Sequence, residues 1–187
     1  ERIEENFFRG RQPNERRQRV FGGHVAGQAL IAAGRTAPDD RAVHSLHAYF
    51  LRRGDFNAPI VYEVDRSRDG ASFSARRVVA IQHGKAIFNL QASFHVSEPG
   101  PDHQLAMPTG LNDPDTLPDF RTRMAPYAEQ IGDWYDRPRP IDLRYVSGDP
   151  ISRQGQPATR QQVWLRADGT LPDDPVLHAC VVTYASD

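Results

Sequence analysis

Asp187 stands where a carboxylate could take part in a reaction with water. Seven residues of an ideal helix turn through about 700°, so Asp187 would lie nearly above Cys180, on the apolar stripe of the preceding helix. A carboxylate in apolar surroundings is costly unless it is partnered or used. With a reference pKa of about 3.9, it is ionised at neutral pH and could hold or deprotonate a water. The alternative is a helix-end acid that bends toward solvent.

Arginines near predicted strand ends form a second group of residues that could bind a ligand. The guanidinium fork matches the geometry of phosphate and carboxylate groups, so these residues are candidates for contacting an anionic ligand. The other interpretation is a solvated sheet surface, which is where most arginines lie. The candidates are Arg52, Arg53, Arg68, Arg76 and Arg77.

The histidines do not have the spacing of a metal site. His44 and His47 are three residues apart on a predicted strand, so we expect them on opposite faces. His24 falls in an apolar helix, where a hydrogen-bonded core residue and a catalytic base are both open interpretations. The sequence has one cysteine and no HExxH pattern, which disfavours zinc.

Two common functional motifs are present only in part. Gly22 and Gly27 have the outer spacing of a phosphate loop, but Gln28 stands where that loop needs a lysine. The stretch from Gly70 to Ser74 ends in the wrong residue for a G-x-S-x-G nucleophile elbow. The sequence therefore favours neither a nucleotide-binding loop nor a serine hydrolase.

The composition limits the classes of partner. A net charge of −1 over 187 residues disfavours a nucleic-acid binder that works by bulk electrostatics. The single cysteine, Cys180, excludes an intrachain disulfide and fits a reducing compartment. No apolar run approaches the roughly 20 residues of a membrane span. We expect a cytoplasmic protein without a membrane span or a nucleic-acid partner.

One apolar stretch, residues 20–34, organises the predicted fold. Between Phe21 and Gly34 its only titratable side chain is His24, so a helix built from it has no face that prefers water. Its glycines and alanines would let other backbones come close, and fifteen residues would make a rod of about 20 Å. Such a helix must be wrapped by other elements.

The strands that follow could wrap this helix. Extended segments are predicted at residues 6–9, 17–21, 43–51, 59–66, 72–82 and 86–96. In the segment 43–51, Val43 and Ser45 fall on one face and His44 and Leu46 on the other. Tight turns at residues 68–70 and 83–84 require antiparallel neighbours. We expect a four-stranded meander around the helix, an α+β arrangement.

The second part of the chain repeats the pattern of two predicted strands followed by an apolar helix. After a linker with a short helix at residues 119–131, strands are predicted at 140–146 and 161–166. Asp174 is a predicted N-cap and Pro175 the first residue of a second apolar helix. We infer a tandem duplication of one fold. The predicted units are an N-terminal repeat (1–98), a linker (99–139) and the start of a second repeat (140–187), which we expect to be truncated at its central helix.

Four motifs resemble the acyl-CoA thioesterase II family, the double hotdog thioesterases. The likeness covers nearly the whole chain, and it implies a double hotdog in which each repeat is a buried central helix wrapped by an antiparallel sheet. The matching motifs are VFGGHVAGQAL (20–30), VHSLHAYFL (43–51), RDGASFSARRV (68–78) and YASD (184–187).

The resemblance implies hydrolysis of fatty acyl-CoA to a free fatty acid and coenzyme A, as part of fatty acid metabolism. In that family an aspartate acts with a Thr or Ser and a Gln to activate water; Asp187 matches the aspartate, and the other two have no counterpart here. The resemblance implies no metal or redox cofactor, and a homo-oligomer, either a dimer or a tetramer. The predicted substrate contacts are Arg68, Arg76, Arg77 and His44.

Two other functions stay open at this point. The absence of counterparts for the Thr and Gln is compatible with a non-catalytic acyl-CoA-binding hotdog module. A hotdog hydratase would need a histidine with a nearby acid, and His24 has no acidic neighbour on its helix.

Overall fold

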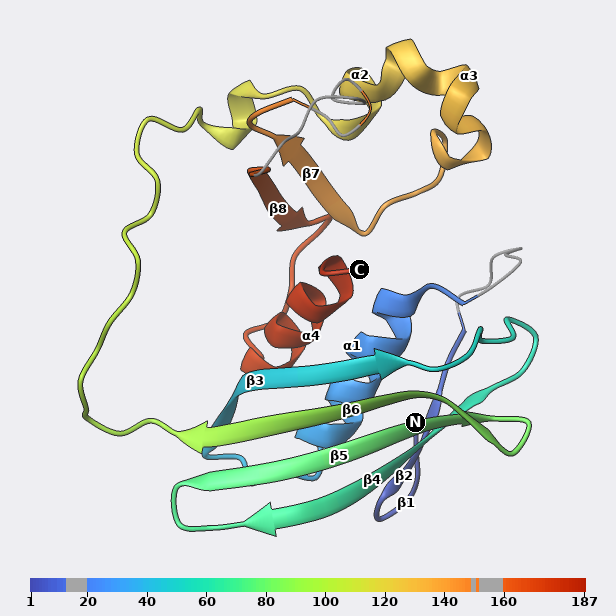
Figure 1. Ribbon diagram of the computed structural model, residues 1–187, viewed down its shortest axis with the longest axis vertical. Helices are drawn as coiled ribbons and strands as arrows, with labels where there is room; N and C mark the ends of the chain where they lie inside the picture. Colours follow the sequence, from blue (N-terminus) through green and yellow to red (C-terminus); the bar gives the residue numbers. More distant parts are fainter. Residues whose placement is uncertain (13–19, 149–150, 152–159) are drawn as a thin grey trace. The chain divides into compact units, whose positions relative to one another are not determined.

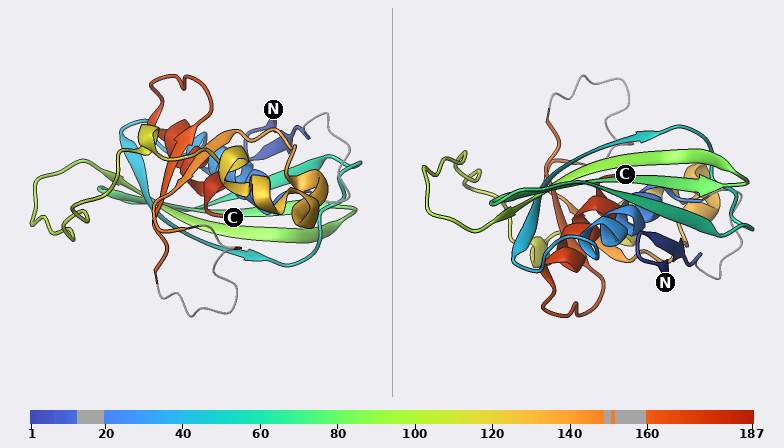
Figure 2. Two further views of the ribbon diagram at one scale, coloured as in Figure 1. Left: turned by 90° about the horizontal axis from the view of Figure 1, so that it is seen from above. Right: turned by 90° about the horizontal axis from the view of Figure 1, so that it is seen from below.

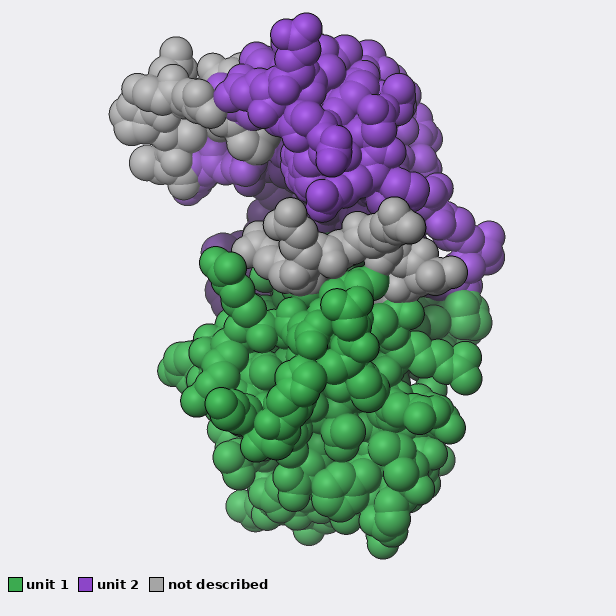
Figure 3. Space-filling model, turned by 90° about the vertical axis from the view of Figure 1, so that its right-hand side faces the viewer, with its two compact units in different colours: residues 1–100, 172–187 green, residues 101–171 purple. Residues whose placement is uncertain are grey.

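The computed structural model describes residues 1–12, 20–148, 151 and 160–187. These residues form two compact units, coloured separately in Figure 3. The first unit contains residues 1–100 and 172–187, and the second contains residues 101–171. None of the described helices is both long and apolar enough to cross a lipid bilayer.

Six antiparallel strands form the sheet of the first unit (Figure 1). They are β1 (Arg2–Glu4), β2 (Phe7–Gly10), β3 (Arg41–Phe50), β4 (Ile60–Asp69), β5 (Phe73–Gln82) and β6 (Lys85–Val96). Their spatial order is β1-β2-β4-β5-β6-β3. The prediction of a four-stranded meander is therefore wrong in one respect. β3 is the edge strand next to β6, and the chain then crosses to β4, which lies between β2 and β5. β3 therefore pairs with β6 instead of β4.

The extended segment predicted at residues 17–21 is not a strand in the part of it that the structure describes. Residues 17–19 lie outside the described part of the chain, and Val20 and Phe21 are not in a strand. The segment predicted at residues 6–9 is confirmed as β2.

Helix α1 (Gly22–Gly34) lies against the inner face of this sheet, as the apolar composition of residues 20–34 predicts. Figure 2 shows α1 and a second helix side by side on one face of the sheet. On α1, Ala29, Leu30, Ala32 and Ala33 are completely buried. The inner face of β6 supplies Phe88, Leu90, Ala92 and Phe94, all at most 4% exposed.

The second helix, α4 (Pro175–Ala185), begins as predicted. The Asp174 side chain accepts hydrogen bonds from the backbone N–H groups of Val176 (2.9 Å) and Leu177 (3.2 Å), and Pro175 is the first helical residue. This cap satisfies two N–H groups that have no partner within the helix.

Three glycines of α1 allow α4 to pack closely against it. A Cβ atom on Gly23 would lie 2.2 Å from the backbone oxygen of Tyr184, and one on Gly27 would lie 3.3 Å from that of Cys180. At Gly34 a Cβ atom would lie 2.6 Å from Cγ1 of Val176. Any larger side chain at Gly23 would push the two helices apart, because the atom it meets belongs to the backbone.

A β-bulge in β3 changes which residues share a face. Val43 pairs with Phe94 and Ser45 with Ser93, so His44 is an extra residue between them. Phe94 is completely buried, so Val43 lies on the inner face and Ser45 on the outer one. The predicted alternation, which put Val43 and Ser45 on one face, is wrong because a bulge shifts the period of two by one residue.

The second unit has a small sheet and a series of short helices. β7 (Ile141–Tyr145) and β8 (Val163–Ala167) pair antiparallel. The helical segments are η1 (Pro114–Thr116), α2 (Phe120–Met124), η2 (Ala125–Tyr127), α3 (Ala128–Ile131) and η3 (Gly132–Trp134). The helix predicted at residues 119–131 is thus divided, with Pro126 in the break and Asp119 as its N-cap. The domain boundaries proposed from the sequence stay a prediction.

Candidate active site

The carboxylate of Asp187 meets the first turn of α1. The backbone N–H of Gly23 donates a hydrogen bond to Oδ2 of Asp187 at 3.1 Å, and a Cβ atom on Gly22 would lie 2.8 Å from Oδ1. The helical geometry of α4 ends at Ala185, so Asp187 follows its C-cap residue, Ser186. The residue as a whole is exposed, but its carboxylate is directed at another helix.

This contact has an electrostatic basis. The first backbone N–H groups of a helix have no partner within the helix and carry a partial positive charge. Helix α1 begins after Phe21, whose side chain cannot cap it, and its first turn contains no acidic residue. Asp187 therefore supplies the negative charge and the acceptor that this helix end lacks.

A pocket of about 590 Å³ opens beside Asp187. Most of its lining residues are apolar, and its charged residues are Asp187, Arg52 and Arg53. Both arginines were among the candidates for anion contact in the sequence. The other lining residues are Val20, Phe21, Gly22, Val25, Phe50, Leu51, Gly54, Ile87 and Phe88.

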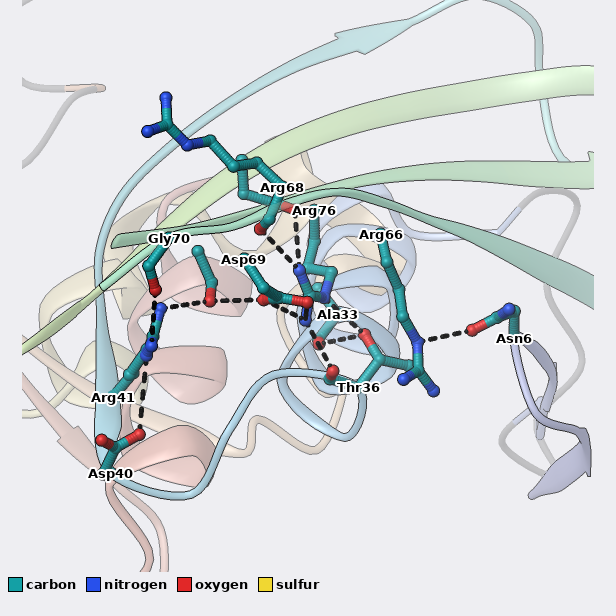
Figure 4. A network of polar contacts seen from close by, with 12 residues as sticks. Asn6, Ala33, Thr36, Asp40, Arg41, Arg66, Arg68, Asp69, Gly70 and Arg76 are labelled. Atoms are coloured by element: carbon teal, nitrogen blue, oxygen red, sulfur yellow. Dashed lines mark hydrogen bonds and ion pairs between the residues drawn. The ribbon is translucent and has the colours of Figure 1, made fainter. Parts of the chain in front are cut away.

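The side chain of Arg76 lies in the interior (Figure 4). Arg76 is completely buried on β5. Its Nε donates to Oγ1 of Thr36, at 3.1 Å, and its Nη2 donates to the backbone oxygen of Thr36 (2.8 Å) and to the carboxylate of Asp69 (2.8 and 3.1 Å). Its Nη1 donates to the backbone oxygens of Arg68 and Ala75.

All the N–H donors of Arg76 are therefore engaged within the protein. The contacts with Thr36 lie directly after α1, and Oγ1 of Thr36 donates in turn to the backbone oxygen of Ala33. This side chain fastens the C-terminal end of α1 to the sheet. No donor is left for a ligand in this structure, and substrate contact by Arg76 stays a prediction from the sequence.

Asp69 joins Arg76 to a second arginine in the same network. Ser74 donates a hydrogen bond to Oδ1 of Asp69 at 2.6 Å, and Arg41 donates to Oγ of Ser74 at 2.7 Å. The hydrogen bond from Ser74, followed by the hydrogen bond and charge of Arg76, holds the pKa of Asp69 below its usual value. Figure 4 shows this line of contacts between the strands and the end of α1.

The other predicted contact residues lie away from the Asp187 pocket. Arg68 and Arg77 are exposed on β4 and β5. His44, the bulge residue, lies 2.8 Å from Oγ of Ser93 through its Nε2. Phe50, which lines the pocket, is six residues further along β3, about 20 Å in an extended strand. The structure does not bring Arg68, Arg76, Arg77 or His44 into the pocket that Asp187 lines.

His24 makes polar contacts on α1. Its Nε2 lies 2.9 Å from the backbone oxygen of Arg11 and 2.9 Å from Nε2 of Gln28. Gln28 also accepts a hydrogen bond from the buried hydroxyl of Tyr62 at 2.9 Å. His24 is hydrogen-bonded, as one interpretation expected, but it is only partly buried and is not a core residue. Among the described residues, no three His, Cys, Asp or Glu side chains are grouped to hold a metal.

Sequence reasoning missed the backbone donors of the site. Gly22 was noted for its spacing to Gly27 and Gly23 for its small size, although their position at the start of α1 is what brings N–H groups to Asp187. The signal was present, since a helix start without a capping side chain needs an external acceptor.

Two protein families match this sequence. Residues 11–95 match the family described as the acyl-CoA thioesterase N-terminal domain. Residues 141–187 match the family described as acyl-CoA thioesterase.

Curated relatives match over the whole chain. Human acyl-coenzyme A thioesterase 8 is 40% identical over 199 residues, covering 100% of this chain and 62% of the relative. Acyl-CoA thioesterase 2 of Haemophilus influenzae is 38% identical over 193 residues, covering 100% of this chain and 66% of the relative. The chain thus spans less than two thirds of the length of these relatives.

Solved structures agree with the architecture. The acyl-CoA thioesterase II TesB2 of Mycobacterium marinum is 45% identical with a TM-score of 0.75, covering 100% of this chain and 64% of that one. A hot dog fold protein of Alicyclobacillus acidocaldarius, 20% identical, has a TM-score of 0.68 over 95% of this chain and 64% of its own. The predicted α+β hotdog fold is confirmed, with the second repeat represented by a small sheet and one helix.

Proposed function

Because the chain belongs to the acyl-CoA thioesterase II family, we propose that the full-length protein hydrolyses fatty acyl-CoA to a free fatty acid and coenzyme A. The observation that supports this most is the contact between Asp187 and the first turn of α1, beside a pocket lined mostly by apolar residues. It combines a carboxylate, backbone N–H donors and room for an acyl chain. A pocket of about 590 Å³ is within the usual size for small-molecule sites.

The proposed reaction is direct attack of water on the thioester carbonyl. Asp187 holds the water and accepts one of its protons while the water oxygen bonds to the carbonyl carbon. The carbon–sulfur bond then breaks, and the proton passes to the leaving thiolate, which gives a carboxylic acid and a thiol. A positioned general base of this kind typically contributes about 10²–10⁴-fold.

The first N–H groups of α1 have the second role in the proposal. During the attack, negative charge develops on the carbonyl oxygen, and fixed N–H donors stabilise it without having to reorient. The N–H of Gly23 points at the Asp187 carboxylate at 3.1 Å, so both groups reach the same small volume. Because the Gly23 N–H is engaged by Asp187, the carbonyl oxygen would bind to a neighbouring N–H group of the same first turn.

The family's site also includes a Thr or Ser and a Gln, by the resemblance described above. None of the described residues lining the Asp187 pocket is a Thr, Ser or Gln. Since the chain covers 62% and 66% of two curated relatives, the proposal concerns the full-length protein.

The test is thioester hydrolysis by the full-length protein and its Asp187→Asn variant. We expect free thiol to be released from medium- and long-chain acyl-CoA, and kcat to fall at least about 100-fold in the variant, with KM nearly unchanged. Equal turnover by both proteins would defeat the assignment of Asp187. Binding of acyl-CoA without turnover by the wild type would favour the non-catalytic binding module.

A further inference from the structure

The pocket beside Asp187 has one positively charged edge. Arg52 and Arg53 follow β3, and Gly54 comes next; all three line the pocket. The remaining walls are mainly apolar. A ligand that fills this pocket therefore meets apolar side chains along one part and two guanidinium groups at another.

Backbone hydrogen bonds hold this edge in place. The N–H groups of Leu51 (2.8 Å) and Arg52 (3.1 Å) both donate to the backbone oxygen of Ile87. The backbone oxygen of Gly54 accepts a hydrogen bond from the N–H of Val20, at 3.4 Å. The backbone on either side of Arg53 is thus attached to β6 and to the residues that precede α1.

A buried glutamine fixes the residues that follow. Gln82, only 4% exposed, accepts a hydrogen bond from the N–H of Asp55 at 2.8 Å. Its Nε2 donates to the backbone oxygens of Asp55 and Ala58, both at 2.8 Å. Because these bonds are made by a buried side chain, the turn from Arg52 to Ala58 is held before any ligand binds.

Asp55, the carboxylate closest in sequence to Arg52 and Arg53, has other partners. The side chain of Asp55 accepts a hydrogen bond from the N–H of Asn57 at 2.9 Å and lies 3.0 Å from Nε2 of His83. The hydrogen bond from Asn57, then that from His83, lowers the pKa of Asp55, so it stays charged. Its partners are not the two arginines.

The guanidinium groups at this edge have free donors. Nη1 of Arg52 donates to the backbone oxygen of Ala86 at 2.6 Å, which uses one of five N–H groups. The guanidinium of Arg53 makes no hydrogen bond or ion pair with any residue that the structure describes. Both side chains are exposed. Two positive charges therefore stand at the pocket without a carboxylate partner in the described chain.

We propose that Arg52 and Arg53 form an anion subsite that binds the phosphate groups of the substrate's carrier, while the apolar walls take the acyl chain. This inference rests on the proposed function and assigns the carrier-binding part of its site. Guanidinium groups bind phosphate through paired, charge-assisted hydrogen bonds. A turn already held by Gln82 and Ile87 binds such a group without first having to be ordered.

The test compares two thioesters with the same acyl chain in the full-length protein. Acyl-CoA carries phosphate groups, whereas the acyl-pantetheine thioester carries none. In the variant with Arg52→Gln and Arg53→Gln together, we expect KM for acyl-CoA to rise about tenfold or more. For acyl-pantetheine we expect KM and kcat to stay within about twofold, because no charged contact is lost.

The control variant is Arg35→Gln. Arg35 is exposed and follows the opposite end of α1, so this change removes a positive charge far from the pocket. We expect KM for acyl-CoA to be unchanged in it. Either of two results would overturn the proposed subsite: an equal rise in KM for both thioesters, or the same rise in the control variant. Neither rise would come from binding of phosphate groups by Arg52 and Arg53.

A binding measurement separates this inference from the proposed function. If neither thioester is hydrolysed by the wild type, the proposed function fails, but calorimetric titration with coenzyme A still tests the subsite. We expect coenzyme A to bind, with Kd about tenfold higher in the double variant and with pantetheine binding equally to both proteins. Equal Kd values for coenzyme A would overturn the inference.

Discussion

Replacing Gly23 by alanine should separate the two helices that form the candidate site. A Cβ atom at this position would lie 2.2 Å from the backbone oxygen of Tyr184 on α4, about 1.2 Å short of the 3.4 Å at which ordinary contact begins. A backbone atom cannot rotate away as a side chain can. The helices must therefore move apart, and the Gly23–Asp187 hydrogen bond of 3.1 Å must lengthen.

The size of the effect follows from this displacement. Misplacing a catalytic group by about 1 Å can reduce the rate about 100-fold, so we expect a fall of that order in kcat for acyl-CoA hydrolysis. Forcing an extra methyl group into a packed interface costs about 1–3 kcal/mol of unfolding free energy. The assays are thiol release by the full-length protein and denaturant unfolding.

Gly27→Ala is the matched control on the same helix. There a Cβ atom would lie 3.3 Å from the backbone oxygen of Cys180, so a shift of a few tenths of an ångström is enough. Alanine also favours the helix interior over glycine by about 0.5–1 kcal/mol. We expect nearly normal kcat and stability. Wild-type kcat and stability in Gly23→Ala would refute the account of how α1 and α4 meet.

Further predictions concern the packing around this site. Arg76→Leu leaves the backbone oxygen of Thr36 at the end of α1 without its partner and removes the ion pair with the half-exposed Asp69, so the unfolding free energy should fall by about 1–3 kcal/mol in urea titrations. Since the pKa of Asp69 is lowered in the folded state, its contribution is complete above the unfolded pKa of about 3.9 and is lost as the pH falls through the folded pKa. The stability difference between wild type and Asp69→Asn should therefore shrink on acidification; a constant difference would contradict this. Burial raises the pKa of Cys180 to about 12, so an aromatic disulfide reagent at pH 8 should label it only after unfolding. Immediate labelling of the native protein would argue against the α1–α4 contact. Asp174→Ala should cost about 1 kcal/mol of stability by removing the cap of α4.

Much of the fold could be predicted because strong local signals agree with the tertiary structure. The uncharged stretch at residues 20–34 forms α1, and the Asp174–Pro175 pair starts α4 where a cap and a first-turn proline predict it. The turn predicted at residues 83–84 lies between β5 and β6, whereas the one predicted at residues 68–70 comes slightly too early, because β4 continues to Asp69.

The errors arise where position depends on distant partners. The position of β3 beside β6 depends on strand pairing between residues far apart in the sequence. The bulge at His44 cannot be recognised from the residue types of β3. The sequence alone does not distinguish a solvated strand arginine, such as Arg77, from one buried against Asp69, such as Arg76. Sequence reasoning named Arg52 and Arg53 as anion candidates, but only the fold places them beside Asp187.

The most direct test of the central claim is a crystal structure of the full-length protein with an acyl-CoA analogue in which a ketone replaces the thioester. We predict that the ketone oxygen lies about 3 Å from a backbone N–H of the first turn of α1, next to the one that Asp187 engages, with a water between the carbonyl carbon and the carboxylate of Asp187. An analogue bound elsewhere, with Asp187 facing bulk solvent, would contradict the account.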